Sequence, residues 1–383
     1  MATENEYRQP EEQDFAMVYI DPEALQILSG ASAQKEQDFR ALLDAAEEGD
    51  LDAQFKVAMS YCNGTDGAPR DGEMAFQWFT RAAEGDHISA QYGLGLCGLR
   101  GIGTEKDVEK GAQQLAQAAE QGYPPAQCEL GLCYETGTGV EMDKFRAAEL
   151  YREAGEFNYA PAQCNLGFFY YRGIGVEKNY AEAVSWFARS AQQEYPRAQI
   201  LLGNCFEAGL GVDKDEEKAV ELYRAAHEQR YNEGTCSLGV CYELGTGVEM
   251  DKAKAVELYR QCADAGFARG IFLLGQCYED GIGVDKNEAK AAELYAKACE
   301  ADNDYPPAIC ALALCYEMGT GVKQDHLTKR GDFVLMVLYS PEGFDLMPAD
   351  IRLSRMKVQQ GIRSAGRIVL ILWIVQRLLS AVE

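Results

Sequence analysis

Two Ser-x-x-Lys tetrads are the residues of this chain best suited to covalent chemistry, because a serine beside a lysine base can act as a nucleophile. They are Ser32 with Lys35 and Ser354 with Lys357. Enzymes that open β-lactam rings with such a pair also carry Ser-Asp-Asn and Lys-Thr-Gly, and neither triplet occurs in the chain. Patterns with two fixed positions arise readily by chance, so the sequence favours a protein with no catalytic residues.

Thirteen cysteines could hold a metal ion or pair as disulfides. No two of them show the Cys-x2-Cys spacing of zinc ribbons, and the three histidines are widely scattered, so we expect no metal site and no cofactor. Most of the cysteines recur at equivalent positions of a repeated helix, which favours buried structural thiols in a reduced protein. Cys262 and Cys299 lie late in the second helix of their repeats.

Glutamates recur directly after an aromatic residue in five repeats, and they are the candidate site of the chain. The site comprises Glu135, Glu207, Glu243, Glu279 and Glu317, with Tyr171 at the corresponding position of a sixth repeat. Equivalent positions line up in a stacked array, so these residues predict an acidic ridge that docks a basic peptide through weak exposed charges. The alternative is a solvated face that binds nothing.

The charge balance narrows the class of partner. Asp and Glu total 61 against 36 Lys and Arg, which gives a net charge of −25. Such a surface repels phosphate backbones, so we expect no nucleic-acid binding and a protein or peptide partner, with a basic one favoured. The first thirteen residues are glutamate-rich and do not resemble an export signal, so we expect a cytoplasmic protein.

A repeated Gly-x-Gly motif defines the elements that carry these residues. The motif recurs every 36 residues at Gly101/Gly103, Gly137/Gly139, Gly173/Gly175, Gly209/Gly211, Gly245/Gly247 and Gly281/Gly283. A seventh copy at Gly319/Gly321 follows after 38 residues, and residues 302–304 accommodate the extra length. A degenerate copy at residues 63–67 makes eight units, between residues 51 and 322.

Each unit predicts two short antiparallel helices. In the third unit one helical stripe comprises Ala126, Leu130, Cys133 and Tyr134, and the other comprises Ala147, Leu150, Tyr151 and Ala154. Pro124 and Pro125 suit the start of the first helix, and Gly137 suits its end. Asp143 is placed to cap the second helix.

Stacking of these hairpins predicts the fold. Helices this short are marginal alone, and each buries its stripe only against a neighbour. A chain of 383 residues also exceeds what one ordinary core supports. We therefore predict an all-α fold, a right-handed α-solenoid of stacked two-helix repeats with a period of 36.

The repeat resembles the Sel1-like family. The motif A-x-x-x-L-G-x-x-Y-x-x-G-x-G-V, followed by D-x-x-K-A-x-E-L-Y-x-x-A, stands at residues 126–140 and 143–154, and its second part again at residues 251–259. The related tetratricopeptide repeat has a period of 34 and lacks the glycine loop. Gly98, Phe206 and Gly234 depart from the motif in single units.

The resemblance implies a scaffold or adaptor that assembles protein complexes, not an enzyme. A β-lactam hydrolase activity claimed for some relatives is one alternative, and a membrane-tethered adaptor is another. The cysteine pairs eight residues apart that staple the units of some secreted relatives do not occur here.

The two ends of the chain differ from the repeats. We predict an acidic flexible tail over residues 1–35 and an N-terminal capping helix over residues 36–50. Residues 323–383 form a divergent segment with an apolar helix at residues 368–375, which is too short for a clean membrane span. That segment either caps the array, associates with a membrane or is an aberrant end.

Overall fold

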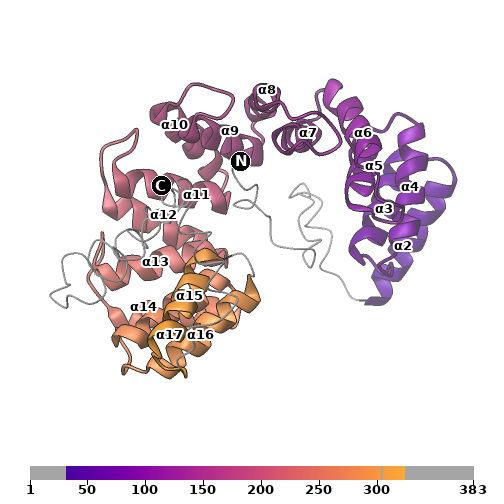
Figure 1. The fold of residues 1–383 in the computed structure, drawn as a ribbon. Helices are drawn as coiled ribbons and strands as arrows, with labels where there is room; N and C mark the ends of the chain where they lie inside the picture. Colours follow the sequence, from indigo (N-terminus) through magenta and orange to yellow (C-terminus); the bar gives the residue numbers. More distant parts are fainter. Residues whose placement is uncertain (1–31, 303–304, 324–383) are drawn as a thin grey trace, which may run out of the picture. The chain divides into compact units, whose positions relative to one another are not determined.

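The computed structural model describes residues 32–302 and 305–323, and in this part of the chain it contains helices α2–α17 and no β-strand. Within each of two units, consecutive helices pack against each other. The chain divides into two compact units, the first ending at Tyr231 and the second beginning at Asn232. The predicted all-α repeat solenoid is confirmed (Figure 1).

The helices alternate between two classes. The first helices of the repeats are α3 (Leu51–Asn63), α5 (Ile88–Arg100), α7 (Pro124–Thr136), α9 (Ala160–Arg172) and α11 (Pro196–Ala208) in the first unit, and α13 (Asn232–Leu244), α15 (Ala268–Asp280) and α17 (Pro306–Met318) in the second. The second helices are α4 (Gly72–Glu84), α6 (Val108–Glu120), α8 (Lys144–Glu156), α10 (Tyr180–Ala191) and α12 (Glu216–Glu228), then α14 (Lys252–Asp264) and α16 (Glu288–Ala301).

The third repeat shows why the hairpin forms. Helix α7 begins with prolines in its first turn and ends at Gly137, whose φ of 72° lets its N–H donate to the carbonyl of Cys133. Asp143 then caps α8 as predicted, because its carboxylate accepts from the N–H groups of Phe145 and Arg146. Thirteen residues per helix give about three and a half turns, enough to present one apolar stripe.

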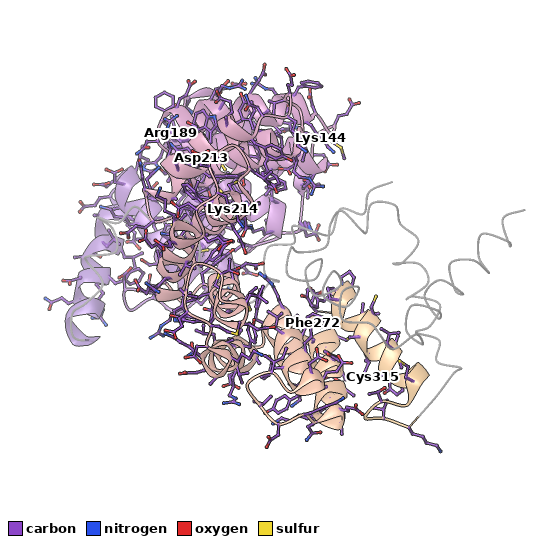
Figure 2. All side chains as sticks on the ribbon, turned by 90° about the vertical axis from the view of Figure 1, so that its left-hand side faces the viewer. Lys144, Arg189, Asp213, Lys214, Phe272 and Cys315 are labelled. Atoms are coloured by element: carbon purple, nitrogen blue, oxygen red, sulfur yellow. The ribbon has the colours of Figure 1, made fainter. Side chains whose placement is uncertain are left out.

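Leucine, glycine and tyrosine form the centre of four hairpins, whose buried tyrosines are Tyr151, Tyr223, Tyr259 and Tyr295. In the third repeat Leu130 and Tyr151 are buried, and Gly131 lies directly beneath the tyrosine ring. A Cβ atom on Gly131 would stand 2.8 Å from Cε1 of Tyr151, so only glycine allows the two helices this approach. In the second unit Phe272 and Cys315 are buried in the corresponding core (Figure 2).

Helix α2 (Ser32–Glu47) precedes the repeats and packs on α3. The predicted limit between tail and capping helix, at residues 35 and 36, falls inside this helix, because no glycine or proline interrupts the segment after Ser32. Phe39 is buried and meets the ring of Tyr61 edge-on at 5.6 Å between ring centroids.

Several sequence predictions concern residues outside the described ones. They are the acidic tail up to residue 31, the divergent segment from residue 324 with its apolar stretch 368–375, and the tetrad Ser354 with Lys357. Among the described residues, no helix combines the length and apolar character needed to cross a membrane.

Candidate partner-binding surfaces

The four predicted ridge glutamates whose side chains are described each accept a hydrogen bond from a buried tyrosine of the following helix. The donor and acceptor atoms are 2.7 Å apart for Tyr151 and Glu135, 2.9 Å for Tyr223 and Glu207, 2.8 Å for Tyr259 and Glu243, and 2.7 Å for Tyr295 and Glu279. In every pair the tyrosine hydroxyl donates to Oε2. The bond therefore joins the two helices of one hairpin.

These glutamates are half-buried rather than fully exposed. Burial raises the pKa of Glu135, and the hydrogen bond from Tyr151 opposes this by stabilising the carboxylate. Burial also raises the pKa of Tyr151 and Tyr259 well above the usual range, and the neighbouring carboxylates add to this. The predicted ridge of exposed charges is thus, at these four positions, a set of hydrogen-bond acceptors inside the hairpins.

The two other ridge positions have different surroundings. Tyr171 is half-buried, and its ring meets that of Tyr180 edge-on at 5.2 Å between centroids. Glu317 lies in α17, but its side chain is outside the described part of the structure. Glu135, Tyr171 and Glu207 belong to the first unit, and the remaining glutamates to the second.

A sequence signal at a spacing of sixteen residues could have identified these pairs. Each glutamate stands sixteen residues before its tyrosine. In two other repeats the later residue has no hydroxyl and the earlier one is not glutamate: Tyr171 precedes Phe187, and Leu99 precedes Leu115. Glu317 is an exception in the sequence, because Phe333 stands sixteen residues after it, so the pairing covers four of the five ridge glutamates.

A second polar network, a glutamine ladder, joins the beginning and the end of single repeats in the first unit. Its members are Gln91 with Gln121 (2.8 Å), Gln163 with Gln193 (2.8 Å) and Gln199 with Gln229 (3.0 Å), each joined by an Nε2–H of the later residue donating to Oε1 of the earlier. The earlier glutamine of each pair is buried. Sequence reasoning missed this ladder, although its spacing of 30 residues is visible in the chain.

The ladder is interrupted in the third repeat. The position that would pair with Gln127 holds Phe157, which cannot donate a hydrogen bond. Gln127 is 4% exposed, and its Oε1 has no hydrogen-bond partner among the described residues, while its Nε2 donates to Glu153. Phe157 itself points outward and is 69% exposed.

Large exposed apolar side chains of the first unit lie at the two ends of helix α8, with Met142 and Phe145 at its start and Phe157 just after its end. Among the described residues of that unit they are Met142, Phe145 and Phe157, of which Phe145 is 73% exposed. Other repeats whose second helix is described place lysine or arginine at the position of Met142 (methionine again in the sixth repeat), glutamate or alanine at that of Phe145, and glutamine at that of Phe157 in three cases. We call these three residues the α8 surface.

Carboxylates and a cation–aromatic pair border the α8 surface. Glu149, Glu153 and Glu156 are exposed on α8, and Glu149 pairs with Arg146 at 3.0 Å. On the neighbouring helix α10, the guanidinium of Arg189 lies 4.3 Å from the ring centroid of Trp186 (Figure 2 labels Arg189 and Lys144). The α8 surface therefore combines aromatic side chains with negative charge.

All thirteen cysteines are free thiols, and all but Cys310 are buried, in agreement with the prediction of structural thiols. No group of three or more potential metal ligands occurs in the described part of the chain. Lys35 and Ser32 lie in the first turn of α2, where the side chains are not described.

Comparison with known proteins decides the family. The Sel1 repeat model matches residues 51–87, 88–123, 124–156, 160–195, 196–231, 233–267, 268–303 and 306–328. The chain belongs to the Sel1 repeat family. Sel1 repeat proteins are generally protein-interaction scaffolds, and their fold is typically non-catalytic. No curated protein matches the chain.

Two solved structures illustrate the similarity. A protective antigen of uropathogenic Escherichia coli strains with an SLR fold is 31% identical, with a TM-score of 0.58, and the alignment covers 75% of this chain and 61% of that chain. A Sel1 repeat protein from Oxalobacter formigenes is also 31% identical, with a TM-score of 0.58, covering 64% of this chain and 96% of that one. This chain thus spans about 61% of the length of the antigen it resembles.

Proposed function

We propose that this Sel1 repeat protein is a non-enzymatic scaffold that binds a basic protein or peptide partner on the α8 surface. The observation that carries the proposal is the exposure of Phe145 and Phe157 at positions where the other repeats with a described second helix hold glutamate, glutamine, alanine or glycine. Aromatic residues dominate the binding energy of protein interfaces, and exposed apolar groups that the fold does not need mark such sites.

The third repeat keeps Phe157 at a cost to its own stability. With phenylalanine at this position the buried Oε1 of Gln127 has no donor, and an unsatisfied buried acceptor costs about 1–3 kcal/mol. A residue that weakens the hairpin yet contacts solvent is best explained by a contact outside the hairpin. We therefore expect the partner to contact the end of α8 where Phe157 lies.

The charge of the protein sets the chemistry of the partner. The net charge of −25 and the carboxylates of α8 attract a basic segment and speed its encounter. The ridge glutamates contribute to this attraction through their charge, while their Oε2 atoms serve the tyrosines. The same acidic surface disfavours nucleic acid, and the free thiols suit a reducing compartment such as the cytoplasm.

Affinity capture with the full-length chain as bait tests the proposal. The captured protein is identified, and its affinity for the chain is then measured. We expect Phe145→Ala with Phe157→Gln to weaken that affinity at least tenfold, which corresponds to about 1.4 kcal/mol. High salt should weaken it further, because the partner is basic.

Met250→Lys is the matched control, since Met250 is 56% exposed and occupies the same loop position in the second unit that Met142 occupies in the first. It should leave the affinity unchanged. Retained binding by the phenylalanine variants would place the partner elsewhere. If only a variant with Glu135, Glu207, Glu243 and Glu279 changed to Gln loses binding, the ridge and not the α8 surface is the docking site.

A further inference from the structure

The second unit holds two thiols in direct contact with each other. Cys236 lies in α13 and Cys262 in α14, and their side chains are hydrogen-bonded across the hairpin. The thiol of Cys262 also donates to the carbonyl oxygen of Asn232 at 3.4 Å, so Cys236 is the donor in the bond between the two cysteines. Both side chains are fully buried.

The second unit is adapted to accept Cys262. The equivalent position of the other second helices is alanine in α4, α6, α8, α12 and α16 and serine in α10. The larger cysteine fits because Gly270 faces it where most first helices have alanine, and a Cβ on Gly270 would overlap with the Cβ of Cys262. The cysteine and the glycine therefore form a matched pair, not a random replacement.

Several groups around Cys262 favour its thiolate, whereas its hydrogen bond to the carbonyl oxygen of Asn232 holds the thiol form. Hydrogen bonds from Cys236 and Thr235 and the positive guanidinium of Arg269 together lower the pKa of Cys262, although burial opposes them. Burial instead raises the pKa of Cys133, Cys205 and Cys277 to about 12. Thiolate is the reactive form of cysteine, so Cys262 differs in reactivity from these other buried thiols.

We infer that Cys262 and Cys236 form a peroxide-sensitive dithiol in which Cys262 is the attacking residue and Cys236 the resolving one. The Cys262 thiolate attacks one oxygen of hydrogen peroxide, the O–O bond breaks, and hydroxide leaves to give a sulfenic acid. The Cys236 sulfur then attacks the Cys262 sulfur, and the sulfenic oxygen departs with the Cys236 proton as water. Two thiols and one peroxide yield one disulfide and two waters.

The disulfide would tie α13 to α14 covalently. It would close a loop of roughly two dozen residues at the start of the second unit and so restrict the unfolded chain. Burial limits the oxidant to a small molecule, because a bulky disulfide such as oxidised glutathione cannot reach either sulfur in the folded hairpin.

Peptide mapping tests this inference. The reduced full-length protein is treated briefly with hydrogen peroxide, and the remaining thiols are trapped before the peptides are mapped. We expect one major cross-linked species joining the peptides that contain Cys236 and Cys262, reversible by dithiothreitol, and a raised melting temperature. Oxidised glutathione at the same concentration should produce no cross-link.

Cys262→Ala and Cys236→Ser should each abolish the cross-link, and Cys262→Ala is expected to fold because alanine is native at this position in five other second helices. Cys277→Ser is the control and should retain it. Preferential oxidation of other cysteines, oxidation of Cys262 to sulfinic acid without a cross-link, or no reaction before the chain unfolds would each overturn the inference. Circular dichroism confirms that every variant is folded.

Discussion

The two units build the same hairpin but fill one buried position differently. In the first unit three of the glutamines at this position bond to glutamines 30 residues later, whereas the second unit has Thr235, Ile271 and the half-buried Ile309 there. An apolar residue needs only volume at this position, but a glutamine needs partners for every buried atom. The comparison teaches that a buried glutamine is the more easily disrupted choice at this position. Opposite Phe157, the Oε1 of Gln127 has no hydrogen-bond partner among the described residues.

The largest effect is expected at a contact that both units share. Gly203→Ala in the first unit and Gly275→Ala in the second would place a Cβ 2.5 Å from Tyr223 and 2.6 Å from Tyr295. We expect each to lower the free energy of unfolding by about 3 kcal/mol through overpacking, measured by urea denaturation. A loss confined to one unit would show that the hairpins are not built alike.

Introducing a glutamine into the second unit should lower the free energy of unfolding somewhat less than the glycine substitutions do. Ile271→Gln buries an amide without the partner it has in the first unit, and we expect a loss of about 2 kcal/mol in urea denaturation. Ala301 stands 30 residues later, at the ladder spacing. Ile271→Gln with Ala301→Gln should recover part of the loss, and no recovery would show that the ladder depends on more than spacing.

Repair of the ladder in the first unit should stabilise it. Phe157→Gln supplies a donor for Oε1 of Gln127, so we expect a gain of about 1 kcal/mol and a higher melting temperature. Phe145→Gln, also at an exposed aromatic residue of α8, is the control and should leave the melting temperature nearly unchanged. A destabilised Phe157→Gln variant would mean that the phenylalanine supports the fold, which would weaken the case for the α8 surface.

The smallest effect concerns the pH dependence of one glutamate. Because burial raises the pKa of Glu135 in the folded state, its contribution to stability is present below its unfolded pKa and is lost as the pH rises through its folded pKa. Glu135→Gln keeps an acceptor for Tyr151 without the charge. We expect it to be a few tenths of a kcal/mol more stable than the wild type near neutral pH, with the difference vanishing on acidification.

Thermal unfolding measured from acidic to neutral pH gives this difference. Glu156→Gln, at an exposed position of α8, serves as the control and should show no such trend. A difference for Glu135→Gln that grows on acidification would reverse the assigned direction.

The fold was predictable because its signals are local. The Gly-x-Gly period, the prolines at helix starts and the cap at Asp143 act within a few residues, and the structure confirms them in the third repeat. The buried state of the cysteines followed from the same periodicity.

The surroundings of the candidate site were less predictable, because they depend on contacts between helices. The prediction took the position of Glu135 as exposed from its own helix, but Tyr151 reaches it from the next one. The contact between Cys236 and Cys262 likewise joins two helices, and no pattern within either helix predicts it. The exposure of Phe157 also escaped prediction, since its position lies between the two helical stripes.

The glycine loops determine at which positions the repeat array tolerates inserted residues. Gly139 lies so close to the carbonyl oxygen of Val108, in the second helix of the preceding repeat, that a Cβ there would overlap with it, and Gly175 meets Lys144 in the same way. The loop thus fixes the spacing between adjacent repeats, so lengthening it would separate them. Additional sequence is accommodated at the opposite end of the hairpin, as the two extra residues near Asp302 illustrate. Such an array grows or shrinks by whole repeats, and a peptide tag inserted next to Asp302 should be accepted where one inserted at Gly139 is not.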